Sequence, residues 1–272
     1  MQPFHLISVL LGLFLIHSQP SIPPQDDGLI AYYSFNECNA RDDSGNGSHG
    51  EIFGETRCWC GIEQEGLVLD GKNNYIEFPG PVNKYFNTSD FTISFYFKSE
   101  KYDVFPQSML SKAEACDEYY TLDLLLDRRI GEVTSKVHET PARYYKDLSP
   151  RLDSSSWMHY ALVREGFRAM TFINGQLRQE SYRCSGVDIG NNAVLSFSNS
   201  PCVLSGRVRR FQGIIDELKI YDHALTIQEI EDLYLMNPVE NANMDCVSFV
   251  PDKKAPQIVM INEKGSTFAT VD

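Results

Sequence analysis

The chain has 272 residues, of which 42% are hydrophobic and 12% aromatic, and its formal net charge is -13 at pH 7. This hydrophobic content is enough for a sizeable core and excludes a disordered chain, and the length has room for one large β domain, or one domain plus a fragment of another. The acidic balance argues against a nucleic-acid partner, because phosphate binding needs a basic surface.

An apolar run, residues 6–16 (LISVLLGLFLI), lies near the N-terminus. It is too short to span a bilayer, which takes about 20 residues, but it has the length of a signal-peptide core. Ser18 is a small residue at a position that suits cleavage. We therefore predict a removed signal over residues 1–20, a leader over residues 21–27 and a secreted mature protein. No later run is long and apolar enough for a membrane helix, so we expect no membrane span.

A polar loop, residues 42–50 (DDSGNGSHG), follows the first strand-like run, residues 29–35. Its glycines let the backbone take positive φ and curl tightly. A curl of that kind turns carbonyls inward, and a neighbouring carboxylate completes the oxygen shell that Ca²⁺ prefers. An ordinary Asn-Gly hairpin turn is the alternative. The stretch by itself leaves both interpretations open.

Seven cysteines agree with an oxidising compartment. Cys38 lies just before the polar loop, and Cys58 and Cys60 lie just after it, so a bridge from Cys38 to either one would fasten the ends of the loop. Cys184 and Cys202 flank a strand-like run and are the candidates for a second bridge. The odd total leaves at least one thiol unpaired or paired between chains. A zinc site is the competing interpretation of Cys58 and Cys60, although their one-residue spacing is poor for zinc.

Many short runs rich in aromatic and β-branched residues, separated by polar turns, fill residues 28–221. The clearest alternation is in residues 91–98, where Phe91, Ile93, Phe95 and Phe97 share one face. No helical pattern intervenes, which predicts a two-sheet antiparallel β-sandwich instead of a βαβ fold. The expected strands are residues 29–35, 66–70, 75–78, 91–98, 108–111, 120–126, 130–137, 157–164, 167–173, 176–180, 193–198 and 211–221.

One short helix is expected near the C-terminus. Thr226 can cap it, and Glu229 three residues later completes a capping box. An apolar stripe at helical spacing predicts packing against the sandwich; it consists of Ile227, Ile230, Leu233 and Tyr234. Asn237 and Pro238 end the helix. Residues 237–272 then read as a linker and the start of a possible second β module.

The last expected strand contains an anomaly, Asp216. Strict alternation would put it on one face with Ile214, Leu218 and Ile220. A carboxylate on an apolar face is costly unless it is paired or coordinates a metal. If the first and last strands are neighbours, Asp216 could complete the cation shell that begins at Asp42.

Several motifs in a fixed order resemble the laminin-G-like jelly roll of the concanavalin A-like superfamily, over residues 28–236. They are LIAYYSF (29–35), DDSGNG (42–47), GLVLDG (66–71), WMH (157–159), FING (172–175), GIIDELKIY (213–221) and ALT (224–226). The resemblance implies an all-β fold of two curved antiparallel sheets and, in many members, one structural Ca²⁺. By position, the ligands would be Asp42, backbone carbonyls around Gly45, Asn46 and Gly50, and the Asp216 carboxylate. The cysteine content, especially Cys58 and Cys60, departs from the usual pattern.

The same superfamily contains laminarinase-type glycosidases, which carry a Glu-x-Asp-x-x-Glu strand. Retaining glycosidases need two carboxyl groups about 5–5.5 Å apart. The nearest approach to that pattern is residues 229–232, which fall on the predicted helix without a third partner. We therefore expect no catalytic activity.

Carbohydrate binding is the leading functional hypothesis and rests largely on the resemblance. Sugar sites use aromatic platforms with polar neighbours, and the candidates are Trp59, Tyr144 and Tyr145. The chain also offers Tyr119, Tyr120, His138 and Trp157, of which Trp157 is predicted to fill the core. The alternative is a protein-binding adhesion or spacer module of a larger cell-surface protein. The expected partner is thus a glycan or an extracellular protein.

Overall fold

A computed structural model describes residues 27–87, 90–99, 104–149, 151–152, 156–182 and 188–242 of the chain. The predicted signal peptide, the leader up to residue 26 and the tail from residue 243 lie outside the described residues. Within the described part, no helix is long and apolar enough to cross a membrane.

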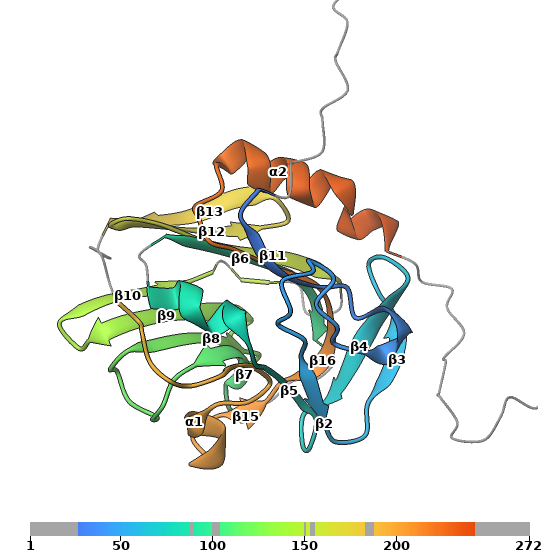
Figure 1. Cartoon of the computed structure of the whole chain (residues 1–272), viewed down its shortest axis with the longest axis horizontal. Helices are drawn as coiled ribbons and strands as arrows, with labels where there is room; N and C mark the ends of the chain where they lie inside the picture. Colours follow the sequence, from blue (N-terminus) through green and yellow to red (C-terminus); the bar gives the residue numbers. More distant parts are fainter. Residues whose placement is uncertain are drawn as a thin grey trace, which may run out of the picture.

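Two sheets of eight strands each pack face to face (Figure 1). The first sheet contains β1 (Leu29–Tyr33), β3 (Arg57–Cys60), β4 (Glu65–Asp70), β6 (Phe91–Ser99), β11 (Met158–Glu165), β12 (Arg168–Ile173), β13 (Gln176–Ser181) and β16 (Gln212–Tyr221). The second contains β2 (Glu51–Phe53), β5 (Tyr75–Phe78), β7 (Gln107–Lys112), β8 (Thr121–Asp127), β9 (Glu132–Thr140), β10 (Arg143–Leu148), β14 (Leu195–Phe197) and β15 (Arg209–Arg210).

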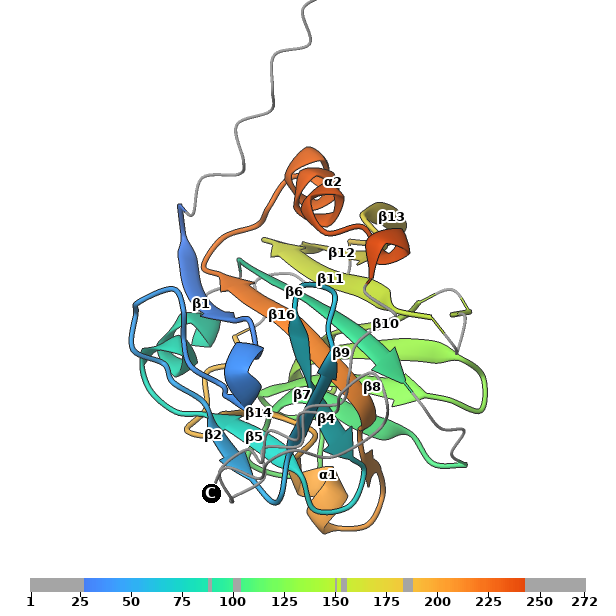
Figure 2. The same cartoon turned by 90° about the vertical axis from the view of Figure 1, so that its right-hand side faces the viewer.

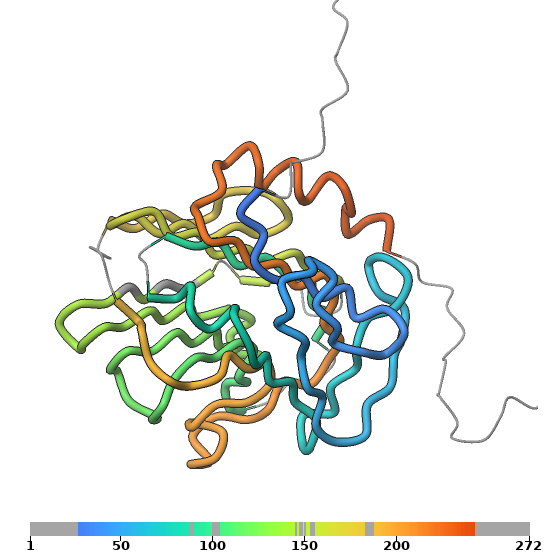
Figure 3. The backbone as a smooth tube through the Cα atoms, in the orientation of Figure 1, coloured from blue at the N-terminus to red at the C-terminus, as the bar shows by residue number. Residues whose placement is uncertain are grey.

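The strand order is β13-β12-β11-β6-β16-β4-β3 in the first sheet, with β1 paired to β16, and β10-β9-β8-β7-β14-β5-β2 in the second, with β15 paired to β7. The pair β15–β7 is parallel. Figure 3 shows how the first strand, β1, runs beside the last long strand, β16, with Tyr33 opposite Leu218. The predicted all-β antiparallel sandwich is confirmed. The first and last strands are neighbours, which was the condition set for a cation shell shared by Asp42 and Asp216.

The core lies between the two sheets and follows the alternation along β6. Phe91, Ile93, Phe95 and Phe97 are all buried there. Phe95 of the first sheet meets Phe197 of the second edge to face, with ring centroids 5.8 Å apart. Each buried aromatic side chain of this kind stabilises the fold by about 1.5–3 kcal/mol.

The helices are short and lie outside the sheets. They are α1 (Pro201–Leu204), α2 (Ile227–Met236) and three 3-10 turns, η1 (Asn36–Cys38), η2 (Pro81–Asn87) and η3 (Val239–Asn241). The capping box of α2 is confirmed: Glu229 N–H donates to Thr226 Oγ1 at 3.2 Å, and Thr226 N–H donates to the Glu229 carboxylate at 2.7 Å. In Figures 1 and 2 the helix covers the outer face of the first sheet. Ile230 and Leu233 pack there, whereas Ile227, predicted to share their stripe, is 43% exposed.

The predicted alternation along β16 is wrong because the strand contains a bulge. The register with β6 shifts between Asp216 and Lys219, and Glu217 has a left-handed φ of 53°. A bulge inserts one extra residue and reverses which face the following side chains occupy. Leu218 and Ile220 therefore enter the core between the sheets, whereas Ile214 packs in a separate cluster with Trp157 and Tyr234. Asp216 shares the face of Ile214 and stays out of the main core.

The strands missed by sequence reasoning, β2, β3, β10 and β15, are short or rich in charge. β15 has only two residues, and β10 reads RYYKDL. Neither run contains the apolar alternation by which strands are recognised. Their pairing partners, and not their own composition, place them in the sheets.

Two disulfides lie within the described residues. Cys38 pairs with Cys58, one of the two partners predicted for it. Cys202 pairs with Cys116, so the predicted bridge from Cys202 to Cys184 is wrong, and Cys184 itself lies outside the described residues. Cys60 is also disulfide-bonded, which leaves neither Cys58 nor Cys60 as a thiol for zinc.

Candidate functional site

A cleft of about 700 Å³ lies on the face of the second sheet that points away from the core. We call it the β8–β9 cleft; its floor is formed by Thr121, Asp123 and Leu125 from β8 and by Lys136 and His138 from β9. The period of two along a strand explains this placement, because the alternate residues of β8, Leu122, Leu124 and Leu126, point into the core.

Asp123 is a buried carboxylate in the floor of the cleft, only 6% exposed. It accepts a hydrogen bond of 2.5 Å from Ser111 Oγ, and its direct cross-strand neighbour is Lys136. Burial raises the pKa of Asp123 to about 6, although Ser111 and Lys136 act in the opposite direction. The cleft therefore contains an acid that titrates close to neutral pH.

His138 is buried in the same cleft, opposite Thr121 of β8, and has no hydrogen-bond partner for either ring nitrogen among the described residues. Burial lowers its pKa, with further lowering by Lys136 and Lys146 and an opposing effect of Glu118. The neutral imidazole offers one donor and one acceptor. Buried polar atoms are costly unless they are hydrogen-bonded, so His138 is an unsatisfied polar group in the floor of the cleft.

The predicted aromatic residues divide between the two sheets. Tyr144 stacks on His138, with ring centroids 4.9 Å apart and planes 13° apart, and is 39% exposed. The next residue, Tyr145, pairs its backbone with Val137 of β9. Trp59 is 41% exposed on β3, an edge strand of the other sheet, and so does not join Tyr144 in one site. Trp157 is buried, as predicted.

The disulfide Cys116–Cys202 forms part of the wall of the β8–β9 cleft. Arg207 reinforces it by donating a hydrogen bond of 3.0 Å to the Cys116 carbonyl. The two cysteines are 86 residues apart, and neither has a local pattern that marks the other as its partner. Of the cleft residues, sequence reasoning named His138, as one of several aromatic candidates, and Cys202, with the wrong disulfide partner.

The polar loop holds Asp42 in a closed network of hydrogen bonds. Its carboxylate accepts the backbone N–H groups of Tyr32 (3.1 Å), Ser44 (3.0 Å) and Ser48 (2.9 Å), as well as the Ser44 hydroxyl. Burial alone would raise the pKa of Asp42, but these hydrogen bonds outweigh it and lower the pKa. Asp42 thus stabilises the conformation of the polar loop by binding its backbone N–H groups.

The other predicted ligands of the loop are also engaged in its structure. Gly45 has a φ of 83°, which requires glycine or a strained residue. Asn46 donates its side-chain amide to the Leu29 carbonyl at 2.9 Å, and Gly50 N–H donates to the Ala40 carbonyl at 2.7 Å.

Asp216 has a separate set of partners. Its carboxylate accepts N–H groups from Ile62 at 2.7 Å, Glu63 at 3.3 Å and Glu217 at 2.9 Å. Burial and the adjacent Glu217 charge raise its pKa well above the usual value. The side chain of β16 that faces the polar loop is Glu217, which with Asp43, Ser44 and Glu63 lines a pocket of about 340 Å³.

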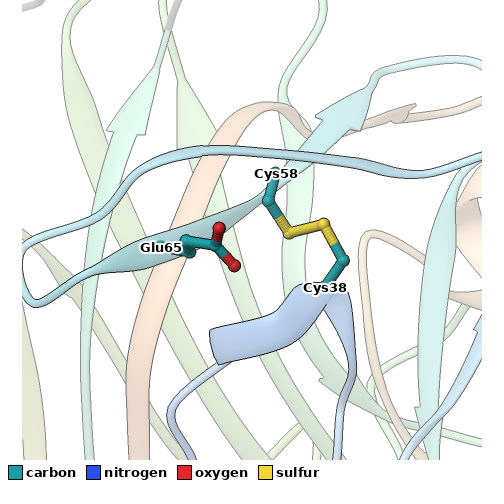
Figure 4. A group of neighbouring side chains, drawn as sticks. All are labelled: Cys38, Cys58 and Glu65. Carbon is teal, nitrogen blue, oxygen red and sulfur yellow. A yellow bond between two sulfur atoms is a disulfide. The ribbon is translucent and has the colours of Figure 1, made fainter. Parts of the chain in front are cut away.

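Among the described residues, one group of three metal-ligating side chains lies close together: Cys38, Cys58 and Glu65 (Figure 4). Both sulfur atoms of this group are joined in a disulfide. The group is therefore not a metal centre, and Glu65 serves instead to accept the N–H of Glu37 at 3.0 Å.

Comparison with protein-family models assigns residues 70–231, more than half of the chain, to a laminin-G-type model. The chain belongs to the concanavalin A-like lectin/glucanase superfamily. This confirms the predicted resemblance. A search of curated proteins found no significant match.

Solved structures with a similar fold include one domain of an arabinanase and the binding domains of two toxins. Domain 4 of AbnA, an extracellular GH43 arabinanase from Geobacillus stearothermophilus solved with arabinotriose, is 23% identical over 76% of this chain and 98% of that domain, with a TM-score of 0.59. The binding domain of Paraclostridial Mosquitocidal Protein 1 is 18% identical, over 77% of this chain and 52% of that one, with a TM-score of 0.60. The binding domain of botulinum neurotoxin DC, solved with SialylT, is 11% identical over 78% and 52%, with a TM-score of 0.61.

The chain therefore spans about half the length of these toxin binding domains. The same neurotoxin domain has also been solved with rat synaptotagmin II. At these low sequence identities, the similarity to the solved structures establishes a shared fold.

Proposed function

We propose that the protein is a secreted, non-catalytic recognition module whose β8–β9 cleft binds carbohydrate. The observation that carries the proposal is the buried, unpartnered His138, which lines the cleft together with Asp123 and Lys136 and stacks on the exposed ring of Tyr144. Aromatic faces pack against the apolar faces of sugar rings, and imidazole, carboxylate and ammonium groups bind hydroxyls. The volume of the cleft lies in the range of small-molecule sites.

The surroundings of Asp123 support recognition over hydrolysis. Glycosidases use two carboxyl groups, about 5–5.5 Å apart in retaining enzymes and 6.5–9.5 Å apart in inverting ones. Two further carboxylates, Asp117 and Glu118, line the same cleft, but Asp123 itself lies between the Ser111 hydroxyl and cross-strand Lys136. At the rim, Asp117 accepts the N–H of Tyr119 at 3.0 Å and so stabilises a turn.

Secretion is supported by the disulfides Cys38–Cys58 and Cys116–Cys202. Disulfides form and persist mainly in oxidising compartments. The signal peptide predicted over residues 1–20 would deliver the chain to such a compartment.

A glycan array probed with the full secreted chain tests the proposal, followed by calorimetric titration of any sugar that binds. We expect binding, and an affinity at least about tenfold lower in Tyr144→Ala, equivalent to about 1.4 kcal/mol. Trp59→Ala is the matched control, because it removes an equally exposed ring from the other sheet. Absence of any bound glycan, or equal affinity in Tyr144→Ala, would refute carbohydrate binding in this cleft. Binding of an extracellular protein in its place would favour the adhesion alternative, for which the neurotoxin domain solved with synaptotagmin II is the precedent.

We also propose a structural Ca²⁺ bound by Asp42, the carbonyls around Gly45, Asn46 and Gly50, and Asp216. Carboxylate and carbonyl oxygens are the ligands that Ca²⁺ prefers. A cation would also compensate the buried charge of Asp216 and its neighbour Glu217.

The structure sets a condition on this metal site. Asp42 and Asp216 accept hydrogen bonds from different backbone groups, so a shared ion would have to exchange those hydrogen bonds for metal bonds. Thermal melts with Ca²⁺ and with chelator test the proposal. A ligand at about 100 times its dissociation constant stabilises by about 2.7 kcal/mol. The metal assignment fails if wild type shows no shift, or if Asp216→Ala shifts as much as wild type.

A further inference from the structure

A second pocket, of about 290 Å³, adjoins the β8–β9 cleft. We call it the Tyr119–Tyr120 pocket; Glu114, Asp117 and Asn192 also line it. Asp117 lines the β8–β9 cleft as well. The two hollows are therefore neighbours that share one wall.

The floor of the Tyr119–Tyr120 pocket is held by a buried ammonium group. Lys112 of β7 is fully buried, and its Nζ donates to the Asn191 carbonyl at 2.8 Å, to Asn191 Oδ1 at 2.9 Å and to the Ala193 carbonyl at 2.9 Å. Burial lowers the pKa of Lys112, against an opposing effect of the Glu114 charge. A buried charge is retained only where its hydrogen bonds are satisfied. Here those bonds fix one conformation of the segment around Asn191.

The walls of the pocket are tied to the same segment. The Asn191 side-chain amide donates to the Tyr120 carbonyl at 2.5 Å, and Asn192 N–H donates to Glu114 at 2.7 Å. Tyr120 has a left-handed φ of 47°, a conformation rare for a bulky residue and typical of functional sites. These hydrogen bonds hold the walls of the pocket in place, and a preorganised site lowers the entropy cost of binding.

The groups that line this pocket match those of the cleft in chemistry. Tyr119 and Tyr120 are 54% and 43% exposed, and the Asn192 side chain is exposed beside the Asp117 and Glu114 carboxylates. Ring faces together with amide and carboxylate groups suit a ligand with apolar ring faces and many hydroxyls. The shared chemistry and the shared wall at Asp117 favour one ligand with repeating units.

We propose that the Tyr119–Tyr120 pocket is a second subsite of the carbohydrate site, so that the preferred ligand is an oligosaccharide chain that spans both hollows. The proposal rests on carbohydrate binding in the β8–β9 cleft. It adds a prediction about the length of the ligand. A monosaccharide or disaccharide occupies only the β8–β9 cleft, whereas a longer chain also contacts Tyr119 and Asn192.

A glycan array that carries each sugar type as a ladder from monosaccharide to hexasaccharide tests this with the full secreted chain. We expect at least about tenfold tighter binding of the hexasaccharide than of the disaccharide of the same ladder. Tyr119→Ala should abolish that gain and leave the affinity for the disaccharide unchanged, and Asn192→Ala should reduce the gain in the same way. Tyr182→Ala is the control, because Tyr182 is 62% exposed next to β13 of the other sheet and lines neither hollow.

The outcomes separate the two proposals. If a disaccharide binds as tightly as the hexasaccharide, or if Tyr119→Ala and Asn192→Ala keep the gain with length, the second subsite is refuted while binding in the cleft stands. If no ladder gives a signal at any length, carbohydrate binding fails, and the second subsite fails with it. The second subsite is also refuted if Tyr119→Ala lowers the affinity for the disaccharide and for the hexasaccharide by the same factor. Tyr119 would then support binding in the β8–β9 cleft and would not contact the additional sugar units.

Discussion

The buried acid in the floor of the β8–β9 cleft makes the stability of the protein depend on pH in a way that can be calculated. Burial raises the pKa of Asp123 from 3.8 to about 6. The folded state therefore holds a proton on this group that the unfolded chain releases. This contribution to stability is complete below about pH 4 and is lost as the pH rises through 6. A difference of about two pKa units corresponds to about 3 kcal/mol.

Asp123→Asn removes the titratable carboxyl group and keeps an oxygen that can accept a hydrogen bond from the Ser111 hydroxyl. We expect the variant to match wild type near pH 4 and to be more stable by up to about 3 kcal/mol at pH 8. The assay is urea denaturation at pH 4, 6 and 8, followed by the fluorescence of buried Trp157. Taking the difference between the two proteins at each pH cancels the titration of all other groups.

Asp43→Asn is the control, because it removes one negative charge from an exposed side chain. A stability difference between Asp123→Asn and wild type that is the same at pH 4 and pH 8 would refute the reasoning. A variant less stable than wild type at pH 8 would refute it as well, since the Asp123 charge would then be stabilising.

Three further changes test other parts of the fold, each by urea denaturation. Asp42→Asn, measured in chelator, should cost about 1–3 kcal/mol, because one amide N–H₂ would face the N–H of Ser48; a change below about 0.5 kcal/mol would contradict the network described for the polar loop. Thr226→Ala should cost about 1 kcal/mol through loss of the helix cap, and an unchanged midpoint would contradict it. Replacing both Cys116 and Cys202 by Ser should lower the free energy of unfolding by about 4 kcal/mol, since their bridge closes a long loop. The same variant should also bind sugar more weakly. An affinity equal to that of wild type would show that the bridge does not shape the cleft.

Local pattern was sufficient to predict most of the strands and the helix α2. The alternation of Phe91, Ile93, Phe95 and Phe97 predicted β6 and its buried face, and Thr226 followed by Glu229 predicted the start of α2. Each signal lies within a few residues, because side-chain period and helix capping are properties of neighbouring positions. The ordered motifs likewise predicted the family, which the model match over residues 70–231 confirms.

The site was decided by tertiary structure. The β8–β9 cleft joins Asp123 and His138 from adjacent strands to Cys202 from α1, and no run of sequence contains all three. One bulged residue, Glu217, reversed the faces of β16 and gave Asp216 the N–H groups of Ile62 and Glu63 as partners. Alternation is a local rule that a single inserted residue breaks, whereas pairing across the chain depends on how distant strands meet. For this reason sequence predicted the sandwich, and only the assembled sheets could show where its cleft lies.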